Sequence, residues 1–453
     1  MIEFVILAAG EGKRMHSALP KVLQPVGGRP MLQHLIDSTN AVGPDRVTVV
    51  VGSGAGLVES AISGQGCRMV MQSERLGTGH AALQALPEMD DEAQVLILPG
   101  DMPLIRPETL RKLLDTAADL TVLSFLADDP TGYGRLLRDE SGRVRGIREH
   151  KDASEHERSV NEVNSGVMRA RAADWRRWLA RIKADNAQGE YYLTDCIALA
   201  VAEGCAVEAV VADDSEELQG ANDRAQLADL EVSFQRRARR SLMASGVTLL
   251  APETVQLRGK VEAQRDVVVD AQVILEGTVF LGEGVSIGQG CVIRDASLAP
   301  GTRLEPYCVL EGVRTTGCCS IGPFARLRPG TELASGVKIG NFVEVKNACF
   351  SDGAKASHLS YIGDATVGER ANLGAGTITC NYDGANKHRT DIGADAFIGS
   401  NSSLVAPVSI GSRATIGAGS VIGKDAPADA LTLTRSSQRS IPGWQRPKKK
   451  DRS

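Results

Sequence analysis

The chain has 453 residues, more than one hydrophobic core usually supports, so we expect more than one domain. Its formal net charge of -5 argues against a nucleic-acid partner, and the basic runs 236–240 and 448–450 are expected to be solvated surface. No apolar run approaches the roughly 18 residues of a membrane span, so no membrane insertion is expected. The nine cysteines are an odd number without C-x-x-C spacing, which favours reduced thiols and a cytoplasmic location.

The first half of the chain alternates between apolar runs of strand length and helical patterns. The runs are 2–7, 47–51, 95–98 and 120–125, and helical patterns such as 31–40 and 107–117 separate them. This order predicts a doubly wound α/β domain whose parallel sheet is covered on both faces. Ligands of such sheets bind beyond the carboxyl ends of the strands, so we expect a site in the loops after Leu7 and Leu98.

The first of these loops reads Leu7-Ala8-Ala9-Gly10-Glu11-Gly12-Lys13-Arg14-Met15 and is followed by Pro20-Lys21. Its small residues let backbone N–H groups approach a phosphate or a base, and Arg14 and Lys21 can add positive charge. Met15 breaks the G-x-G-x-x-G pattern, and the Gly-Lys-Ser/Thr of a Walker motif is absent from the sequence. Taken alone, the loop is equally consistent with a structural turn.

The second loop follows 95–98 with the sequence Pro99-Gly100-Asp101. A carboxylate at the tip of a buried strand can bind Mg²⁺ together with substrate phosphates, because Mg²⁺ is held through one or two carboxylates plus phosphate oxygens. The alternative interpretation of Asp101 is the N-cap of the helix that follows.

Residues 222–243 read as an amphipathic helix with Leu227, Leu230, Phe234 and Ala238 on one face. We expect this helix to connect two domains. The alternative is that it only ends the first domain.

A six-residue repeat then continues for more than half of the remaining chain. Aliphatic residues recur at 275, 281, 287 and 293, again at 321, 327, 333, 339 and 345, and in Ile-Gly pairs from 392 to 423. Hexads of this kind predict a parallel β-helix in which three hexads close one triangular coil, so 255–424 should form about nine coils of about 18 residues. A β-sandwich is the weaker alternative, because the turns of a sandwich recur at wider intervals than one hexad.

Stacking of the coils predicts two columns of side chains. Arg328 and Lys346 are one coil apart and should lie one above the other, where a phosphate would offset their repulsion. His358 follows within the next coil and is the best candidate base of the repeat region. The same count predicts a second column, suited to a long extended ligand, from Tyr382, Ser400 and Ala418, and it predicts a loop where 379–389 breaks the repeat.

Several motifs carry a resemblance to a known family. The first loop, Pro20-Lys21, Leu76-Gly77-Thr78-Gly79-His80 and Gly100-Asp101 resemble the sugar-nucleotide pyrophosphorylases. Further motifs are 132–135, 149–151, 164–166, 189–195 and 379–384. With the hexapeptide repeats, essentially the whole chain is similar to the bacterial bifunctional N-acetylglucosamine-1-phosphate uridyltransferases and glucosamine-1-phosphate N-acetyltransferases. The resemblance implies a pyrophosphorylase (uridyltransferase) domain over 1–222, a linker helix over 223–245, and an acetyltransferase domain over 246–453 that forms a left-handed parallel β-helix.

The resemblance also assigns residues in the first domain. Arg14 and Lys21 match the phosphate-binding cations, and Asp101 and Asn222 match the ligands of Mg²⁺. The residues that match the binding site for UTP and the UDP-N-acetylglucosamine product are Leu7, Ala8, Ala9, Gly10, Lys21, Gln72, Gly77, Thr78, Pro99, Gly100, Asp101, Gly134, Glu149, Asn164 and Asn222. Members of the family often have an aromatic residue at the position of Pro99, which puts a side-chain contact from that position in doubt.

In the repeat domain the resemblance makes His358 the base that accepts a proton from the sugar amine. The residues that match the glucosamine-1-phosphate site are Arg328, Lys346, Tyr361, Asn372 and Lys387, and those that match the acetyl-CoA site are Asn381, Tyr382, Ser400, Ala418 and Arg435. Hexapeptide acyltransferases resemble one another in forming homotrimers, so the same state is expected here.

The expected product, UDP-N-acetylglucosamine, is a precursor of peptidoglycan and lipopolysaccharide in this family. One alternative is a single-activity sugar-1-phosphate nucleotidyltransferase with a structural β-helix. Another is a regulatory or scaffold protein that binds a nucleotide without turnover. Arg14, Lys21 and Asp101 count against the scaffold, and the set containing Arg328 and His358 counts against the single activity.

Overall fold

The computed structural model describes residues 1–447 and divides the chain into two compact units, Met1–Arg237 and Ala238–Ser453. Helix α8 (Arg224–Ala244) contains the division, and it matches the helix expected at 222–243. Within the described part of the chain, no helix combines the length and the apolar character that crossing a membrane requires. The basic run at 448–450 lies outside the described residues, whereas 236–240 lies in α8. The expectation that 236–240 is solvated surface is wrong at Arg239, which is buried because its guanidinium donates to the carbonyls of Glu253 and Val255.

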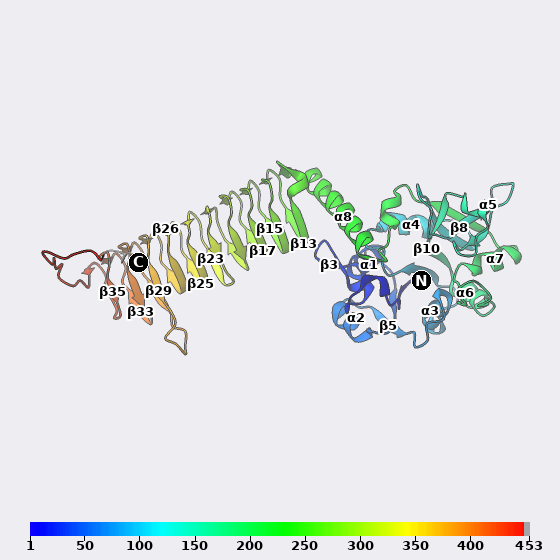
Figure 1. The fold of residues 1–453 in the computed structure, drawn as a ribbon, viewed down its shortest axis with the longest axis horizontal. Coiled ribbons are helices and arrows are strands. Elements are labelled where there is room, and N and C mark those ends of the chain that lie inside the picture. The colour runs from blue at the N-terminus through cyan, green and yellow to red at the C-terminus, as the bar shows by residue number, and fades with distance from the viewer. Residues whose placement is uncertain (448–453) are drawn as a thin grey trace, which may run out of the picture. The chain divides into compact units, whose positions relative to one another are not determined.

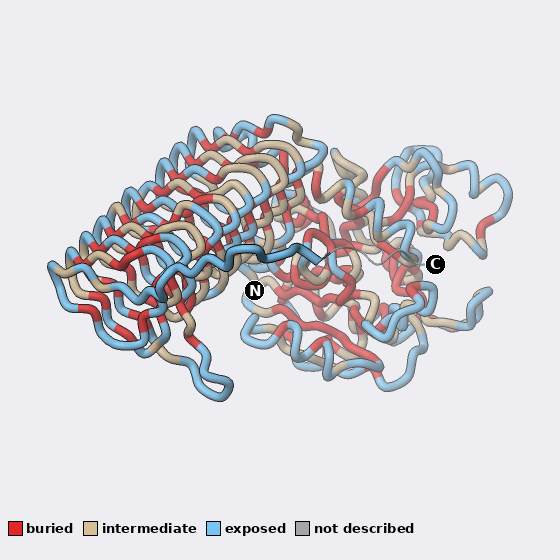
Figure 2. Tube along the Cα trace, turned by 60° about the vertical axis from the view of Figure 1, so that its left-hand side comes forward, coloured by how far each residue is buried: buried red, intermediate tan, exposed pale blue. Residues whose placement is uncertain are grey.

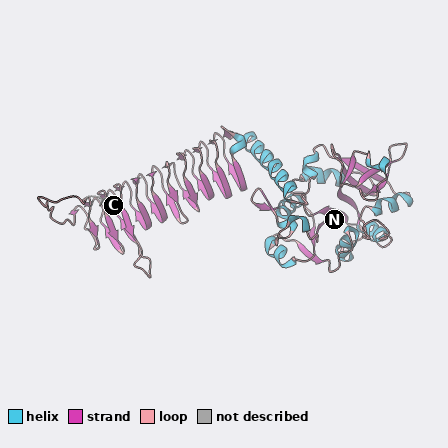
Figure 3. Cartoon of the chain, in the orientation of Figure 1, coloured by secondary structure: helices cyan, strands magenta, loops and turns pink. Residues whose placement is uncertain are grey.

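The first unit is built on a mixed sheet of nine strands (Figures 1 and 3). Its main order is β11 (Val207–Val211), β7 (Leu120–Leu126), β10 (Glu162–Arg171), β6 (Gln94–Pro99), β1 (Ile2–Ala8), β4 (Arg46–Val51) and β5 (Arg68–Met71), with β8 (Arg135–Arg138) and β9 (Val144–Arg148) attached beside β10. The four apolar runs predicted as strands are confirmed as β1, β4, β6 and β7. A small separate sheet pairs β2 (Pro25–Val26) with β3 (Arg29–Pro30).

The expectation of a wholly parallel sheet is wrong at β10. This strand runs antiparallel to both β6 and β7, whereas the pairs of β1 with β4 and β6 are parallel. The sequence of β10 hid it, because Asn164-Ser165-Gly166 interrupts its apolar pattern and its register with β7 shifts between Asn164 and Met168.

Helices cover both faces of the sheet, as predicted. Successive residues of β1 point to opposite faces, so Phe4 and Ile6 belong to one core and Val5 to the other. Helices α1 (Met31–Asn40), α2 (Ala55–Ile62) and α4 (Pro107–Asp115) pack into the core that contains Phe4 and Ile6. Helices α3 (Thr78–Ala85), α6 (Ala172–Leu179) and α7 (Asp195–Ala202) pack into the core that contains Val5. The shorter helices of this unit are η1 (Lys13–Met15), η2 (Lys21–Leu23), η3 (Leu86–Glu88), α5 (Glu155–Arg158) and η4 (Ser215–Leu218).

The second unit is the predicted parallel β-helix (Figure 1). One sheet consists of β12 (Thr248–Leu249), β14 (Val268–Val269), β16 (Ser286–Ile287), β18 (Arg303–Leu304), β21 (Ser320–Ile321), β24 (Lys338–Asn341), β26 (Lys355–His358), β28 (Asn372–Leu373), β31 (Phe397–Ile398), β34 (Thr415–Ile416) and β36 (Leu431–Thr432). The short helix η5 (Pro252–Thr254) follows its first strand. These eleven strands exceed the expected nine or so coils, because the stack reaches beyond 255–424 at both ends.

A larger sheet of 14 strands forms the rest of the β-helix. Its members are β13 (Gln256–Ala263), β15 (Ile274–Leu281), β17 (Val292–Leu298), β19 (Val309–Glu311), β20 (Val313–Thr315), β22 (Arg326–Leu327), β23 (Thr331–Leu333), β25 (Glu344–Phe350), β27 (Tyr361–Val367), β29 (Ile378–Cys380), β30 (Thr390–Ile392), β32 (Ser403–Val405), β33 (Val408–Ile410) and β35 (Val421–Ile422). Neighbouring strands such as β13 and β15, or β25 and β27, pair in parallel, which is inconsistent with a β-sandwich.

The predicted aliphatic lattice forms the core of the β-helix. Leu275, Leu281, Ile287 and Ile293 are all buried, and buried and exposed positions alternate along the coils in Figure 2. The step from coil to coil is not constant. Ser320 pairs with Lys338, but Lys338 pairs with Lys355, which comes one residue earlier than a constant step would place it. A column of stacked residues that is predicted from a constant step between coils therefore moves out of register along the β-helix.

The predicted column of Tyr382, Ser400 and Ala418 is wrong for its first member. Leu373 pairs with Ile398, a much longer step than the one from Ala356 to Leu373, because extra residues form a loop after β29 (Figure 1). Tyr382 lies in this loop and pairs with Lys387 across it. Ser400 and Ala418 do stack, since the carbonyl of Ser400 accepts a hydrogen bond from the N–H of Gly419 at 2.8 Å.

Candidate active sites

A cavity of about 470 Å³ opens in the first unit where β1 and β6 end. Nine residues that the sequence had singled out line it: Leu7, Ala9, Gly10, Gln72, Gly77, Thr78, Pro99, Glu149 and Asn164. The other eight lining residues had no assigned role. Five of them lie within the predicted motifs, namely Glu11, Gly166, Glu190, Leu193 and Thr194, and the remaining three are Arg75, Ala81 and Met168. The two predicted loops therefore meet at one cavity, as expected for the carboxyl ends of neighbouring parallel strands.

The glycine of the second loop allows the two strand ends to come together. The N–H of Gly100 donates to the carbonyl of Leu7 at 2.9 Å, and a Cβ at Gly100 would lie 3.3 Å from the Cα of Ala8. Both Ala8 and Gly100 are buried behind the cavity and do not line it. Pro99 does line it and packs on Gly166, where an added Cβ would lie 2.8 Å from the Pro99 ring.

The wall around Gln72 and Gly77 is fixed by a segment more than a hundred residues later. The N–H of Tyr191 donates to the carbonyl of Leu76 at 2.7 Å, and the N–H of Leu193 donates to the hydroxyl of Thr78 at 3.1 Å. The buried amide of Gln72 in turn donates to the carbonyl of Gly77 at 3.2 Å. Gly77 has a φ of 110°, which favours glycine, so this turn depends on the motif that contains it.

Glu149 is a buried carboxylate that lines the cavity. Burial raises its pKa, and a 3.0 Å hydrogen bond from the hydroxyl of Thr194 partly opposes that rise. Gly134 lies directly against it, since a Cβ there would be 3.3 Å from Oε1 of Glu149. The carbonyl of Gly134 also accepts a hydrogen bond from the N–H of Asn164 at 2.8 Å, so these three predicted residues lie together.

A cation-binding point lies beside this cavity. The ammonium of Lys21 is 2.5 Å from a carboxylate oxygen of Asp101 and donates to the amide oxygen of Asn222 at 2.9 Å. Two side-chain oxygens thus converge on one positive centre. Their hard oxygen donors suit Mg²⁺, which takes one or two protein oxygens and completes its shell with phosphate and water. Among residues 1–447 there is no cluster of three or more His, Cys, Asp or Glu side chains able to hold a metal without substrate.

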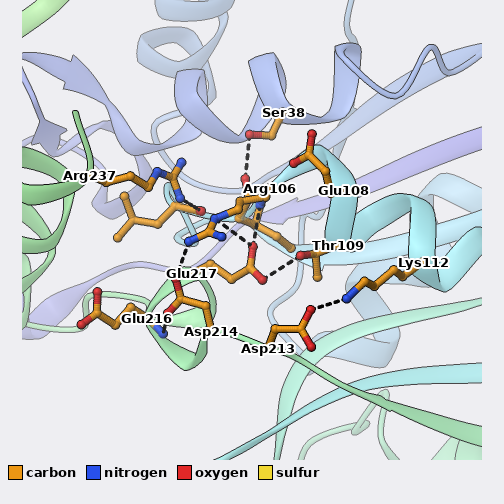
Figure 4. A network of polar contacts seen from close by, with 12 residues as sticks. Ser38, Arg106, Glu108, Thr109, Lys112, Asp213, Asp214, Glu216, Glu217 and Arg237 are labelled. Carbon is orange, nitrogen blue, oxygen red and sulfur yellow. Dashed lines mark hydrogen bonds and ion pairs between the residues drawn. The ribbon is translucent and has the colours of Figure 1, made fainter. Parts of the chain in front are cut away.

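A polar network joins residues 106–109, in the segment that follows Asp101, to residues 214–217, in the segment that precedes Asn222 (Figure 4). The carboxylate of Glu217 accepts from the N–H of Arg106 at 3.0 Å and from the hydroxyl of Thr109 at 2.7 Å. The guanidinium of Arg106 also pairs with Asp214. The network therefore ties the chain just after Asp101 to the chain just before Asn222, and burial raises the pKa of Glu217 within it.

Arg14 is the predicted residue of this unit that the structure does not bring to the others. It is exposed in η1 and does not line the cavity. The neighbouring Glu11 instead forms ion pairs with Lys13 at 3.0 Å and with Arg75. Arg75 is a cavity-lining cation that sequence reasoning missed, because no motif distinguishes it from other surface arginines.

In the second unit, three predicted cations gather on the β-helix. Arg328 and Lys346 follow residues that pair between β22 and β25, which confirms that they stack. Lys387 reaches them from the inserted loop. The pKa of Lys346 is lowered mainly by its contact with the ammonium of Lys387, and repulsion from Arg328 lowers it further. The clustered charges are suited to binding an anion. Glu344 offsets part of the charge through a 2.9 Å ion pair with Arg328.

Tyr361 and Asn381 lie next to these cations. The amide of Asn381 donates to the hydroxyl of Tyr361 at 3.5 Å and to the carboxylate of Asp364. Asp364 also accepts from Asn347 at 2.5 Å. A side chain at Gly363 would overlap both Tyr361 and Asn381, so this glycine opens the space that the two occupy.

His358 ends strand β26 and is exposed. Its Nδ1 lies 2.8 Å from the amide oxygen of Asn341, a residue that sequence reasoning did not single out. Asn372 lies on β28, the next strand of the same sheet.

The remaining predicted residues lie around the end of the stack. Ser400 and Ala418 are exposed neighbours in successive coils, and Tyr382 is exposed in the inserted loop. The guanidinium of Arg435 approaches the same coil, since a Cβ at Gly417 would be 3.6 Å from it.

Comparisons with known proteins agree with both halves of this description. Residues 4–161 match the family of MobA-like NTP transferase domains, and residues 389–424 match the bacterial transferase hexapeptide (six repeats). A bifunctional protein GlmU of Alkalilimnicola ehrlichii is 54% identical over 98% of this chain and 96% of its own length. Those of Stutzerimonas stutzeri and Aromatoleum aromaticum are each 53% identical over 99% of this chain and over 100% and 99% of their own lengths. With this identity along nearly its whole length, the chain belongs to the family of bifunctional GlmU proteins.

Proposed function

We propose that the chain is a bifunctional enzyme that makes UDP-N-acetylglucosamine, a precursor of peptidoglycan and lipopolysaccharide. It N-acetylates glucosamine-1-phosphate with acetyl-CoA and then transfers a uridylyl group from UTP to N-acetylglucosamine-1-phosphate, releasing pyrophosphate. The observation that carries this proposal is the near-full-length identity of 54% to a bifunctional GlmU protein. We assign uridylyl transfer to residues 1–222, acetyl transfer to residues 246–453, and the connection to the helix between them.

Uridylyl transfer proceeds by in-line attack of a sugar-phosphate oxygen on the α-phosphorus of UTP, with cleavage of the bond to the β-phosphate. Positioning and charge neutralisation supply most of the catalysis in such a transfer. Gln72 and the Gly77 backbone bind the base, while Glu149 and Asn164 at the cavity wall hold the sugar together with Gly134, which lies against Glu149. When bound through Asp101 and Asn222, Mg²⁺ supplies further neutralisation of the phosphates.

Lys21 binds the phosphates with a positive charge that belongs to the protein itself. Its ammonium already lies between Asp101 and Asn222, where it neutralises the carboxylate. Arg14 is exposed at the loop, so we propose that it contacts phosphate only after the loop closes on UTP. The backbone N–H groups after Leu7 approach the nucleotide because Ala8, Ala9 and Gly10 are small.

Acetyl transfer begins with the sugar amine attacking the carbonyl carbon of acetyl-CoA. His358 accepts the amine proton, the C–S bond breaks, and the proton is passed to the leaving sulfur, which departs as coenzyme A thiol. Arg328, Lys346 and Lys387 bind the phosphate of the acceptor, with Tyr361 and Asn372 beside it. Asn381, Tyr382, Ser400, Ala418 and Arg435 bind acetyl-CoA along the last coils.

We also propose a homotrimer associated through the β-helix. Tyr307, Phe324 and Phe342 stack at 5.3 and 5.4 Å between ring centroids, yet they are 45%, 47% and 55% exposed. All three have positive φ, a backbone conformation that bulky residues rarely adopt. A contiguous exposed apolar column of this kind marks a protein interface, and exposed Leu359 extends it to the residue after His358.

The nine cysteines are free, which supports a cytoplasmic location.

The test is a matched pair of substitutions in the full-length protein. Asp101→Ala should abolish uridylyl transfer and leave acetyl transfer, while His358→Ala should do the reverse. Thiol release from acetyl-CoA that requires glucosamine-1-phosphate measures the second activity, and pyrophosphate release measures the first. Loss of both activities from one substitution in a folded protein would contradict the assignment of two separate sites. Absence of thiol release from a protein that still releases pyrophosphate would favour a nucleotidyltransferase with a structural β-helix.

A further inference from the structure

The contact between His358 and Asn341 defines which nitrogen of the histidine carries the proton. Nδ1 of His358 lies 2.8 Å from Oδ1 of Asn341. An amide oxygen can only accept a hydrogen bond, so Nδ1 must be the donor. In the neutral ring the proton on Nδ1 leaves Nε2 with a free lone pair. The contact therefore selects the tautomer whose outer nitrogen can accept a proton from substrate.

The fold holds the two side chains in this relation. Asn341 and His358 are the last residues of β24 and β26, and they are partners in the parallel register. The chain then turns a corner after each of them, with Phe342 at a φ of 55° and Leu359 at 47°. The N–H of Leu359 donates to the carbonyl of Asn341 at 3.0 Å, which locks the two corners together.

The close approach of these coils depends on a glycine. A Cβ at Gly340 would overlap the carbonyl oxygen of Ser357, so no other residue fits there without moving the coils apart. The hydroxyl of Ser360 donates to the carbonyl of His358 at 2.8 Å on the other side. The backbone around the pair is therefore held from both directions.

The partner of the ring is an amide and not a carboxylate. The charged side chains of the neighbouring strands are Lys338 on β24 and Lys355 on β26 itself, and β28 contributes Asn372 and Leu373. An amide orients the imidazole without adding the negative charge that would stabilise the imidazolium. Asn341 thus orients the ring and selects its tautomer as an uncharged partner.

We propose that Asn341 is a positioning residue for acetyl transfer, which fixes the tautomer and orientation of His358 through Nδ1. The proposal rests on the assignment of His358 as the base of the proposed function. Asn341 contacts Nδ1 of His358 and acts through this ring, whose other nitrogen accepts the proton.

The experiment compares Asn341→Ala, Asn341→Asp and His358→Ala in the full-length protein. Asn341→Ala should lower kcat for acetyl transfer by about 10- to 100-fold, the usual effect of removing an orienting partner, with KM for glucosamine-1-phosphate unchanged. Asn341→Asp keeps the acceptor but adds a charge that favours the imidazolium. Its kcat should therefore recover at high pH, with the acidic limb of kcat/KM moved to higher pH. Uridylyl transfer should be unchanged in both variants.

A spectroscopic measurement separates positioning from general damage to the coil. With ¹⁵N-labelled histidine, the His358 resonances, identified by their loss in His358→Ala, should report a protonated Nδ1 in the parent and a mixture of tautomers in Asn341→Ala. Gln289→Ala is the matched control, because the amide of Gln289 makes a similar coil-to-coil contact with Gln272 at 3.3 Å. This control should change neither activity nor the His358 signals.

The outcomes are distinct. Full acetyl transfer and an unchanged tautomer in Asn341→Ala, alongside an inactive His358→Ala, would overturn the positioning role while leaving the base assignment intact. An active His358→Ala would overturn the base assignment and this proposal with it. An equal loss in Asn341→Asp and Asn341→Ala at every pH would also overturn the proposal, because it would reflect disruption of the coil.

Discussion

The proposed sites of the two units for phosphorylated sugars are built in opposite ways. In the first unit the site is a cavity whose wall includes buried polar groups such as Gln72 and Asn164. In the second unit the site is a set of cations on the outside of a regular β-helix, led by Arg328, Lys346 and Lys387. The first proposed site offers enclosure and hydrogen bonding for selecting a ligand, and the second offers charge on a rigid surface.

The contacts that build the sites also differ in reach. Lys21 and Asn222 are 201 residues apart in the sequence, and Thr194 reaches Glu149 across 45 residues. In the β-helix, Asn341 and His358 are only one coil apart. Damage in the first unit should therefore spread through the sheet, whereas damage in the second should remain within neighbouring coils.

The largest expected effect comes from closing the gap between two coils. Gly340→Ala places a methyl group onto the carbonyl oxygen of Ser357, and the nearest atoms all belong to the Ser357 backbone, which cannot rotate out of the way. We expect acetyl transfer to be lost and the second unit to lose about 3 kcal/mol or more, the upper range for overpacking. Uridylyl transfer should persist. Activity assays and denaturant unfolding of the same preparations measure both.

Gly423→Ala is the control for that substitution. An added Cβ there lies 4.0 Å from Val405, in ordinary contact, so stability should change by no more than about 0.5 kcal/mol. If Gly340→Ala were as active and as stable as Gly423→Ala, local rigidity of the coils would not be needed at the second site.

The next effect tests recognition by clustered charge. Lys387→Met removes one of three cations, and we expect KM for glucosamine-1-phosphate to rise about 10- to 100-fold, with kcat nearly unchanged. The pKa of Lys346 is lowered by Lys387 and Arg328, so in the parent Lys346 loses its charge at a lower pH than an ordinary lysine does. KM in the parent should therefore rise as the pH becomes alkaline. In Lys387→Met the neighbour that lowers the pKa of Lys346 is gone, so the rise of KM with pH should begin at a higher pH.

Steady-state measurements of KM from about pH 7 to about pH 10 make this comparison. Lys338→Met, which removes an exposed lysine from the other sheet, serves as the control and should leave KM unchanged. A parallel rise in both variants would mean that net charge alone attracts the acceptor.

Most of the fold follows from the sequence because its signals are local. The hexad lattice around Leu275 and Ile293 predicts the β-helix, and the apolar runs predict four of the strands of the first sheet. Strand β10 was not predicted, because the polar residues in its centre are typical of a loop. Tyr382 was misplaced because an insertion within one coil lengthens the step from Leu373 to Ile398.

The sites are less predictable, because their last contacts depend on packing. Motifs identified Lys21, Asp101 and Glu149, but only the folded chain shows that Thr194 donates to Glu149. Asn341 carries no motif. Counting one coil back from His358 would have found it, but no sequence signal indicates which coils are one residue shorter than the others.

A smaller effect is expected from the enclosed carboxylate of the cavity. Thr194→Val keeps the shape of the side chain but removes the hydroxyl that donates to Glu149. We expect kcat/KM for N-acetylglucosamine-1-phosphate to fall about tenfold, as for the loss of one hydrogen bond to a charged group. Thr194→Ser, which keeps the hydroxyl, should behave as the parent.

The pH dependence of stability gives a second readout of Thr194→Val. The pKa of Glu149 is raised in the folded state, so ionising it costs stability as pH rises above the unfolded value near 4.5. Without Thr194 the pKa rises further and the cost grows. Denaturant unfolding should therefore show little difference between variant and parent below that value and a growing deficit of the variant toward neutral pH. An equal deficit at every pH would point to packing instead of the hydrogen bond.

The smallest effect contrasts two arginine–carboxylate pairs of the same geometry. Arg138 donates to Glu162 at 2.7 and 2.8 Å, and Glu162 also accepts from Ser124 at 2.8 Å. Burial acts to raise the pKa of Glu162, but these hydrogen bonds outweigh it and the pKa is lowered. Arg413 donates to Asp429 at 2.6 and 2.7 Å on the exposed β-helix, where water and salt screen the pair.

Arg138→Gln should cost about 1 kcal/mol at neutral pH, whereas Arg413→Gln should leave the unfolding midpoint unchanged. The sign of the pH dependence follows from the lowered pKa of Glu162: its contribution is present above the unfolded value near 4.5 and is lost as pH falls through the folded value. The deficit of Arg138→Gln should therefore shrink on acidification, because the parent loses the same interaction. A deficit that persists at low pH would assign the effect to packing of the arginine stem, and the first unit would then depend on charge no more than the second.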